Sequence, residues 1–155
     1  MKSKRTLQAF VGLALAFTLT ACGGQTEIDP AQALSSMEEQ LTFTDQLAQI
    51  DKSGACRAYG VEEDLVEDCA ALSGSGATAE SLSVWKAVDA DSAEQIESQL
   101  QTFVDGYIEG YASYKPEEVP KLESAILSRS GVYVILCVSA DNEAAQSVVE
   151  QALQS

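Results

Sequence analysis

The segment SAILSRSGVYVILCVSA, residues 124–140, decides the fold of this chain. Residues 124–128 and 132–139 are apolar and rich in residue types that favour strands, and Arg129-Ser130-Gly131 between them supplies a turn. The segment therefore predicts a β-hairpin. Its second strand is apolar almost throughout, which indicates a central strand that is covered on both faces or nearly so.

A final helix is predicted directly after this hairpin. Asp141 is a good N-cap residue, and a helix over residues 141–153 turns one apolar face inward. The residues of that face are Ala144, Ala145, Val148, Val149 and Ala152.

The most regular helical pattern lies upstream, over residues 92–113. Ser92 is an N-cap candidate, and Gln95 three residues later completes a capping-box pattern. One face collects apolar residues at helical spacing, namely Ile96, Leu100, Phe103, Val104, Tyr107, Ile108 and Tyr111. We interpret this face as packed on the core, and a groove lined by its aromatic residues is the alternative.

Four further segments complete the predicted domain. Residues 81–88, SLSVWKAV, alternate with a period of two and are predicted to form a strand, and residues 66–72 could form a short one. The sequence SGSGA at residues 73–77 is typical of a turn, and residues 31–40 favour a helix. No internal repeat or second domain is visible. We therefore predict an α+β fold, a single small domain over residues 31–155 with a mainly antiparallel sheet and helices packed on it.

The N-terminal sequence MKSKRTLQAFVGLALAFTLTAC is typical of an exported precursor. Three basic residues precede an uncharged stretch over residues 7–19, which is shorter than the roughly 20 residues that a membrane-spanning helix needs. Leu19-Thr20-Ala21-Cys22 resembles the lipobox of bacterial lipoprotein precursors. This resemblance implies that diacylglycerol is attached to the Cys22 thiol and that the chain is cut before it. We therefore expect a signal peptide over residues 1–21, and a lipidated cysteine with a flexible tether over residues 22–30.

Two acyl chains hold a protein on a membrane firmly, whereas one chain binds only reversibly. We therefore expect the protein at the extracytoplasmic face of the cell membrane, with the membrane bound through the lipid on Cys22. An ordinary cleaved signal and an uncleaved anchor are the alternatives.

Composition narrows the chemistry. The chain has 24 acidic and 9 basic residues, a formal net charge of −15, and no histidine. Its acidic surface repels phosphate backbones, so we expect no nucleic-acid partner. Without histidine it lacks the commonest general base and transition-metal ligand. The acidic residues within 62–68 lack the spacing of a calcium loop, and we interpret them as solvated surface. We assign no catalytic, cofactor-binding or metal-binding residue and no cofactor.

Three cysteines remain after Cys22. Cys137 lies in the apolar strand of the hairpin, and we interpret it as a small buried hydrophobe. Cys56 and Cys69 could close a disulfide, which an oxidising exterior permits, or they could stay free thiols. The sequence leaves both alternatives open because it does not fix the separation of their Cα atoms.

Several segments match a known family in the family's order. They are Tyr59-Gly60-Val61-Glu62-Glu63, Ala79-Glu80 before a strand, Tyr114-Lys115-Pro116-Glu117-Glu118, and residues 131–141. Together they cover most of residues 45–153, and the chain resembles the domain of unknown function 4358 family, found as small lipoproteins of Gram-positive bacteria. The resemblance implies extracytoplasmic placement, an α+β fold and a short helix over residues 52–59. It implies no activity.

Two classes of function remain open. One is a non-catalytic binding or accessory module of the cell envelope, whose partner would be an unidentified envelope protein. The other is a small extracytoplasmic hydrolase or thiol enzyme that works without histidine. The small acidic domain and the lack of a recognisable catalytic motif favour the first class.

Overall fold

One antiparallel sheet forms the centre of the computed structural model, which describes residues 27–154. The expected signal peptide, Cys22 and the first part of the expected tether lie outside the described residues. Within them, five strands lie side by side in the order β1-β2-β3-β5-β4. Their bounds are β1 (Ala48–Ile50), β2 (Val66–Ser73), β3 (Ser81–Ala87), β4 (Ile126–Ser130) and β5 (Tyr133–Val138).

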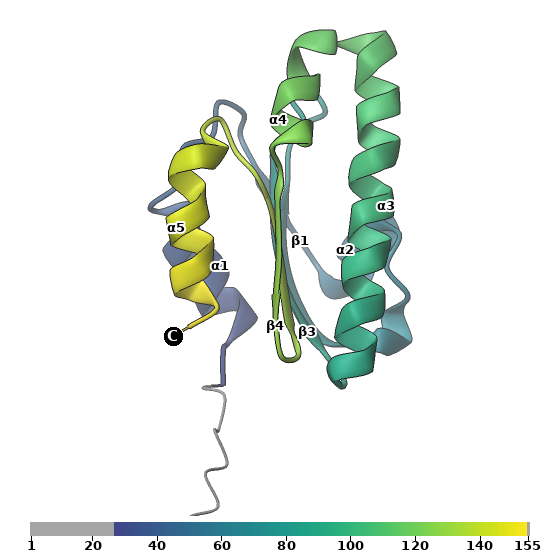
Figure 1. Cartoon of the computed structure of the whole chain (residues 1–155), viewed down its shortest axis with the longest axis vertical. Coiled ribbons are helices and arrows are strands. Elements are labelled where there is room, and N and C mark those ends of the chain that lie inside the picture. Colours follow the sequence, from purple (N-terminus) through teal and green to yellow (C-terminus); the bar gives the residue numbers. More distant parts are fainter. Residues whose placement is uncertain (1–26, 155) are drawn as a thin grey trace, which may run out of the picture.

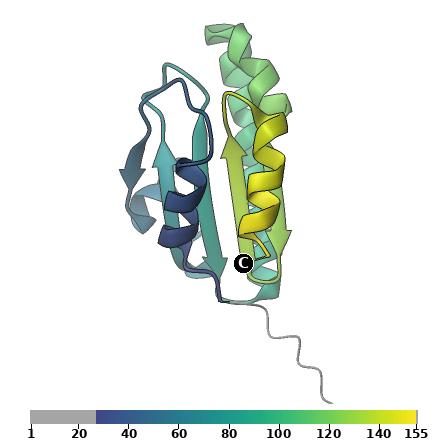
Figure 2. The same ribbon diagram turned by 90° about the vertical axis from the view of Figure 1, so that its left-hand side faces the viewer.

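Helices cover both faces of this sheet. Their bounds are α1 (Pro30–Glu38), α2 (Lys52–Tyr59), α3 (Ala90–Tyr114), α4 (Val119–Glu123) and α5 (Asn142–Ala152). Helices α1 and α5 lie on one face, while α2 and the long α3 lie on the other (Figures 1 and 2). No helix of the described residues is both long and apolar enough to cross a membrane. The predicted α+β fold is confirmed.

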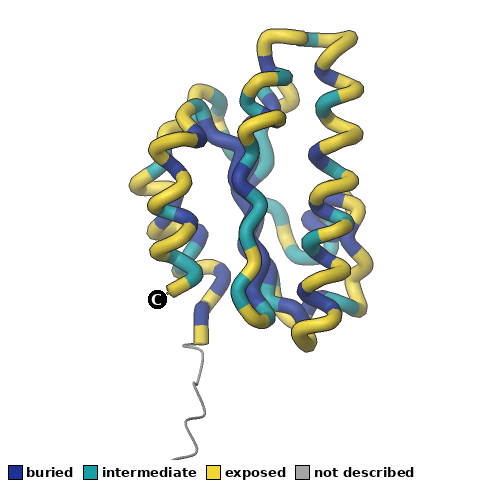
Figure 3. The backbone as a smooth tube through the Cα atoms, viewed as in Figure 1, coloured by how far each residue is buried: buried dark blue, intermediate teal, exposed yellow. Residues whose placement is uncertain are grey.

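The sheet separates two apolar cores, because neighbouring strand residues point to opposite faces. Towards α1 and α5 the central strands turn Leu82, Val84, Ile135 and Cys137. Towards α2 and α3 they turn Trp85, Val134, Leu136 and Val138. Every residue of β5 is buried, as the blue tube at the centre of Figure 3 shows. The predicted central strand and the burial of Cys137 are therefore confirmed.

The hairpin is confirmed, but its turn begins at Gly131 and not at Arg129, two residues later than the sequence predicted. Strand β4 continues to Ser130, which pairs with Tyr133. The turn therefore consists of Gly131 and Val132. Gly131 has a φ of 55°, a conformation that glycine adopts without the cost a side chain would bring.

The capping prediction for α3 was wrong. The N-cap is Asp89, whose carboxylate accepts a hydrogen bond from Ser92 N at 2.7 Å. Ser92 lies inside the first turn and is buried. Aspartate and serine are equally good N-cap residues. Asp89 lies three residues before Ser92 and satisfies a backbone N–H at the helix start that would otherwise lack a partner.

Helix α5 confirms the expected cap. Asp141 accepts a hydrogen bond from Ala144 N at 3.0 Å. Ala145 and Val149 are buried, and Val148 and Ala152 pack against the same core. Ala144 is exposed, so its inward placement was wrong. A helix of this length buries a narrower stripe than the sequence pattern indicated.

The folded domain begins earlier than the sequence predicted. Asp29 caps α1, and Ile28 is buried, with its backbone N–H donating to the Tyr133 hydroxyl at 3.0 Å. Glu27 forms an ion pair with Lys86 at 3.0 Å. These contacts place residues 27–30 on the domain, although the sequence assigned them to the tether. The short helix implied for residues 52–59 is confirmed as α2.

Candidate functional site

A buried carboxylate organises the end of the sheet where β3 begins. Glu80 is 1% exposed. One of its oxygens accepts from the backbone N–H groups of Thr44 and Asp45 at 2.7 and 2.9 Å. The other accepts from Thr44 Oγ1 at 2.7 Å and Lys121 Nζ at 2.8 Å. Burial opposes ionisation, but the hydrogen bonds from Lys121 and Thr44 lower the pKa of Glu80 overall.

A second buried carboxylate, Glu118, shares the same lysine. Lys121 Nζ lies 3.1 Å from a carboxylate oxygen of Glu118. Glu118 also accepts a hydrogen bond from Ala79 N at 3.0 Å, and Lys115 Nζ donates to Ala77 O at 2.7 Å. These side chains, from the end of α3 and the segment after it, therefore fasten the loop between β2 and β3.

Asp45 fastens the same loop from its other side. Its carboxylate accepts from Ser75 N at 2.8 Å and from Thr78 Oγ1 at 3.3 Å. Hydrogen bonds from Ser75 lower the pKa of Asp45. We call Asp45, Glu80, Lys115, Glu118 and Lys121 the charge network. It consists of three carboxylates and two ammonium groups.

A row of aromatic side chains runs beside the charge network from the core to the surface. Its members, in order of contact, are Trp85, Tyr59, Phe103, Tyr107, Tyr111 and Tyr114, with ring centroids 5.7, 4.7, 4.1, 5.9 and 6.1 Å apart. Trp85 is fully buried, whereas Tyr107 is 40% and Tyr114 73% exposed. We call this set the aromatic row.

A small pocket opens beside the middle of the aromatic row, with a volume of about 40 Å³. Four rings line it, those of Tyr59, Phe103, Tyr107 and Tyr111, together with Ser81 of β3 and the loop between β2 and β3. We call it the aromatic pocket. Two of its hydroxyls are engaged, because Tyr59 donates to Leu72 O at 3.1 Å and Tyr111 to Thr78 O at 2.6 Å. Burial raises the pKa of both tyrosines.

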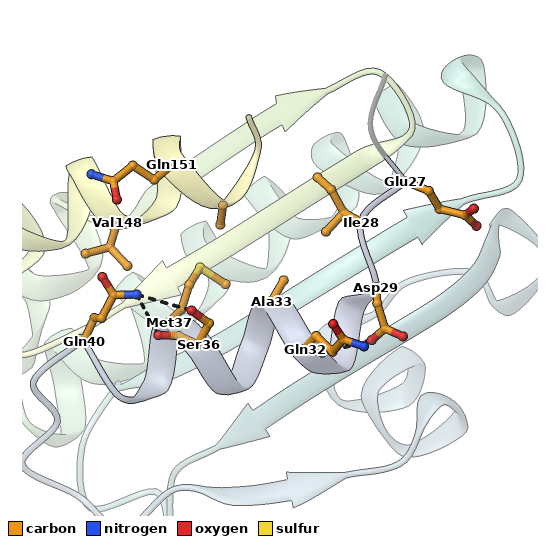
Figure 4. A pocket seen from close by; sticks show the side chains of 11 residues that line it. Glu27, Ile28, Asp29, Gln32, Ala33, Ser36, Met37, Gln40, Val148 and Gln151 are labelled. Carbon is orange, nitrogen blue, oxygen red and sulfur yellow. Dashed lines mark hydrogen bonds between the residues drawn. The ribbon is translucent and has the colours of Figure 1, made fainter. Parts of the chain in front are cut away.

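A larger groove of about 350 Å³ lies between α1 and α5. Ile28, Met37 and Val148 supply its apolar lining, as Figure 4 shows. Polar side chains of α1 lie beside them, and the side-chain amide of Gln40 donates to Ser36 O at 2.8 Å. The groove is open and mixed in polarity.

The three cysteines of the described residues are free thiols. Burial raises the pKa of Cys56, and it raises the pKa of both Cys69 and Cys137 to about 12. Cys56 of α2 is part of the apolar core between the sheet and α3, and Cys69 of β2 packs against the same core. A thiol with a raised pKa is protonated at neutral pH and is a poor nucleophile. Pairing of Cys56 with Cys69 stays a prediction.

The acidic residues within 62–68 do not form a site with other side chains. Residues 62–68 lie on η1 (Glu63–Leu65) and the adjoining end of β2, and their carboxylates are exposed. Among residues 27–154, no three acidic or cysteine side chains come together in a way that could hold a metal ion. Cys22 lies outside the described residues.

Sequence reasoning missed the charge network and Ser81. Glu80 and Glu118 are distant in sequence, and only the fold brings them to one lysine. A signal was nevertheless present, because two segments that carried the family resemblance, Ala79-Glu80 and residues 114–118, meet there.

The comparisons with known proteins give one family match. The family model described as Domain of unknown function (DUF4358) matches residues 39–139. This range holds the whole sheet, the charge network and the aromatic row, but not α1 or α5. No curated protein and no solved structure gives a significant match. Because the family model matches well over half of the chain, the chain belongs to the DUF4358 family.

Proposed function

We propose that this protein is a lipid-anchored, extracytoplasmic lipoprotein whose domain is a non-catalytic binding or accessory module of the cell envelope. The signal-like N-terminus and the lipobox ending at Cys22 support the address. The observation that carries the binding role is the exposed end of the aromatic row on α3. Tyrosine is enriched at protein contact surfaces, where it combines a large apolar area with a polar tip.

The position of this surface fits a membrane anchor. The chain enters the domain at Glu27, which pairs with Lys86 beside the start of α3. Helix α3 has 25 residues and is therefore about 37 Å long. Tyr107, Tyr111 and Tyr114 lie near its C-terminal end. Figure 1 shows that this end of α3 is the one farther from the point where the chain enters the domain. Because five peptide units join Cys22 to Glu27, they span at most roughly 18 Å. The tyrosines would then face away from the membrane.

Two glycines open the surface around these tyrosines. Gly106 and Gly110 lie one helical turn apart on α3, and a Cβ added at either position would meet no atom within 4 Å. A glycine inside a helix costs about 1 kcal/mol relative to alanine. Packing within the described residues does not require these glycines, whereas close approach of a partner would.

The chemistry of the domain supports a non-catalytic role. Glu80 and Lys121 are committed to structural hydrogen bonds, and the three thiols have raised pKa values. These features weigh against the alternative of a hydrolase or thiol enzyme. We expect the protein to turn over no common ester, peptide or glycoside substrate. Hydrolysis that disappears on Glu80→Gln or Cys69→Ala would contradict this expectation.

Crosslinking in intact membranes tests the binding role. A photoreactive phenylalanine analogue would replace Tyr114 in one variant and Val88 in a matched control, since Val88 is 51% exposed but lies beside the start of α3. We expect a discrete protein adduct from position 114 and none from position 88. Equal adducts from both positions, or none from either, would contradict the proposal.

A further inference from the structure

The aromatic pocket contains a buried hydroxyl that the fold leaves unsatisfied. Ser81 is 6% exposed. Its Oγ is the only buried side-chain nitrogen or oxygen without a hydrogen-bond partner in the part of the chain that the structure describes. Towards the Tyr59 hydroxyl Ser81 can act only as a hydrogen-bond donor, an arrangement that opposes the increase in the pKa of Tyr59, because the proton of Tyr59 is donated to Leu72 O. The lone pairs of Ser81 Oγ are therefore left without a donor. An unpaired buried hydroxyl is costly, so this one marks a place for a ligand atom.

The next residue on the same face of β3 shows the contrast. Ser83 is also buried, and its Oγ accepts a hydrogen bond from Trp85 Nε1 at 2.8 Å. Ser81 points to the same side of the sheet, towards α2 and α3. Ser81 therefore lines the aromatic pocket, whereas Ser83 contacts the indole of Trp85.

The walls of the pocket fit a cation. Four aromatic rings surround a volume of about 40 Å³, so an occupant lies within cation–π range of several of them, about 6 Å. The adjoining charge network has one more carboxylate than ammonium groups, and the whole chain carries a net charge of −15. A field of this sign attracts cations and repels anions.

The size and the hydrogen bonding select among cations. About 40 Å³ holds a group the size of one or a few water molecules. Ser81 Oγ can accept a hydrogen bond only from a cation that has an N–H group, which excludes a quaternary ammonium. A guanidinium is planar and presents five N–H donors, so it needs more room and more acceptors than a primary ammonium, which presents three.

We propose that the aromatic pocket binds a primary alkylammonium group, which donates to Ser81 Oγ and lies against the four rings. The proposal rests on the proposed binding role and names the chemistry that the module recognises. Gly76 and Tyr107 are exposed at the mouth, so the alkyl chain leaves the pocket there. The group can belong to a lysine side chain or to a free amine, because both present the same ammonium.

Titration of the full chain in a non-ionic detergent tests the proposal. Butylammonium is the probe, and 1-butanol and tetramethylammonium are its neutral and N–H-free counterparts. We expect saturable amide shifts at Ser81 and Gly76, and a fluorescence change of Trp85, which contacts Tyr59, with butylammonium alone. A blocked lysine peptide that binds roughly tenfold more tightly than butylammonium identifies a lysine side chain as the source. Equal affinity identifies a free amine.

Three variants give the controls. Ser81→Ala and Tyr107→Leu should each weaken butylammonium binding roughly tenfold. Ser81→Ala should not lower the melting temperature, because it removes a buried hydroxyl that accepts no hydrogen bond. Val88→Ala should bind normally, because Val88 lies outside the pocket, and Tyr114, the crosslinking position, does not line it either. Amine binding can therefore fail while crosslinking from position 114 succeeds, and the reverse. Equal shifts with butanol, or unweakened binding to Ser81→Ala, would overturn the proposal.

Discussion

At the scale of single residues, Glu80 shows how a charge can be buried in this fold. Each of its two carboxylate oxygens accepts two hydrogen bonds, and Lys121 supplies the opposite charge. Removing one partner of such a pair leaves the other poorly compensated, which is more costly than the pair itself is stabilising. Glu80 therefore specifies where residues 44–45, the start of β3 and α4 meet.

Glu80→Gln should lower the free energy of unfolding by about 2 kcal/mol at pH 7. The folded-state pKa of Glu80 lies below its ordinary value of 4.5, so its contribution is fully present above that pH. It is lost as the pH falls through the folded-state pKa. Denaturant titrations at several pH values should therefore show the difference between wild type and variant shrinking below about pH 4.5.

Glu117→Gln is the matched control, because Glu117 is exposed and lies next to Glu118 on η2 (Pro116–Glu118). Its effect should stay within about 0.5 kcal/mol at every pH. If Glu80→Gln lowers the free energy of unfolding by the same amount at every pH, the shape of the Glu80 side chain matters and its charge does not.

The thiols give a second prediction at this scale. If Cys56 and Cys69 pair after export, alkylation without reductant should modify Cys137 alone, and only after unfolding, because Cys137 is fully buried. Mass spectrometry of the alkylated protein measures the number of modified thiols. Modification of all three thiols in protein from oxidising conditions would reject the pairing.

At the scale of elements, the spacing of apolar residues predicted those helices and strands whose formation depends on local sequence. The hairpin of β4 and β5 and the strand β3 follow from apolar runs and alternation, and α3 and α5 follow from helical spacing. Strand β1 was missed because three residues are too few to show a period, and pairing with β2 defines it. The start of α3 was misplaced because Asp89 and Ser92 both fit an N-cap. The charge network was not predicted as a unit, because Lys115, Glu118 and Lys121 are close in sequence but meet Asp45 and Glu80 only through the fold.

Capping of α5 gives a prediction at the scale of elements. Asp141→Ala removes the acceptor for Ala144 N and should cost about 1 kcal/mol of unfolding free energy. Glu143→Ala, in the same first turn and exposed, keeps the cap and should cost less than half as much. Thermal unfolding of both variants measures the difference. Equal losses would show that first-turn charge, and not the cap, stabilises α5.

At the scale of the whole molecule, the fold separates two ends. The chain enters beside Lys86, and the exposed tyrosines lie at the other end of α3 (Figure 1). This arrangement gives the proposed anchor and the proposed contact surface separate places. A lipid on Cys22 would hold one end of the domain near the membrane while the aromatic end meets a partner.

The lipid on Cys22 is the central claim about the whole molecule, and fatty-acid labelling in the native host tests it most directly. Cells would be grown with a labelled fatty acid and would express either the wild-type chain or Cys22→Ala. We predict that the wild-type protein carries the label and is cut before Cys22, whereas Cys22→Ala carries no label and accumulates as uncleaved precursor. Label on the N-terminal region of Cys22→Ala, or an unlabelled wild-type protein, would contradict the account.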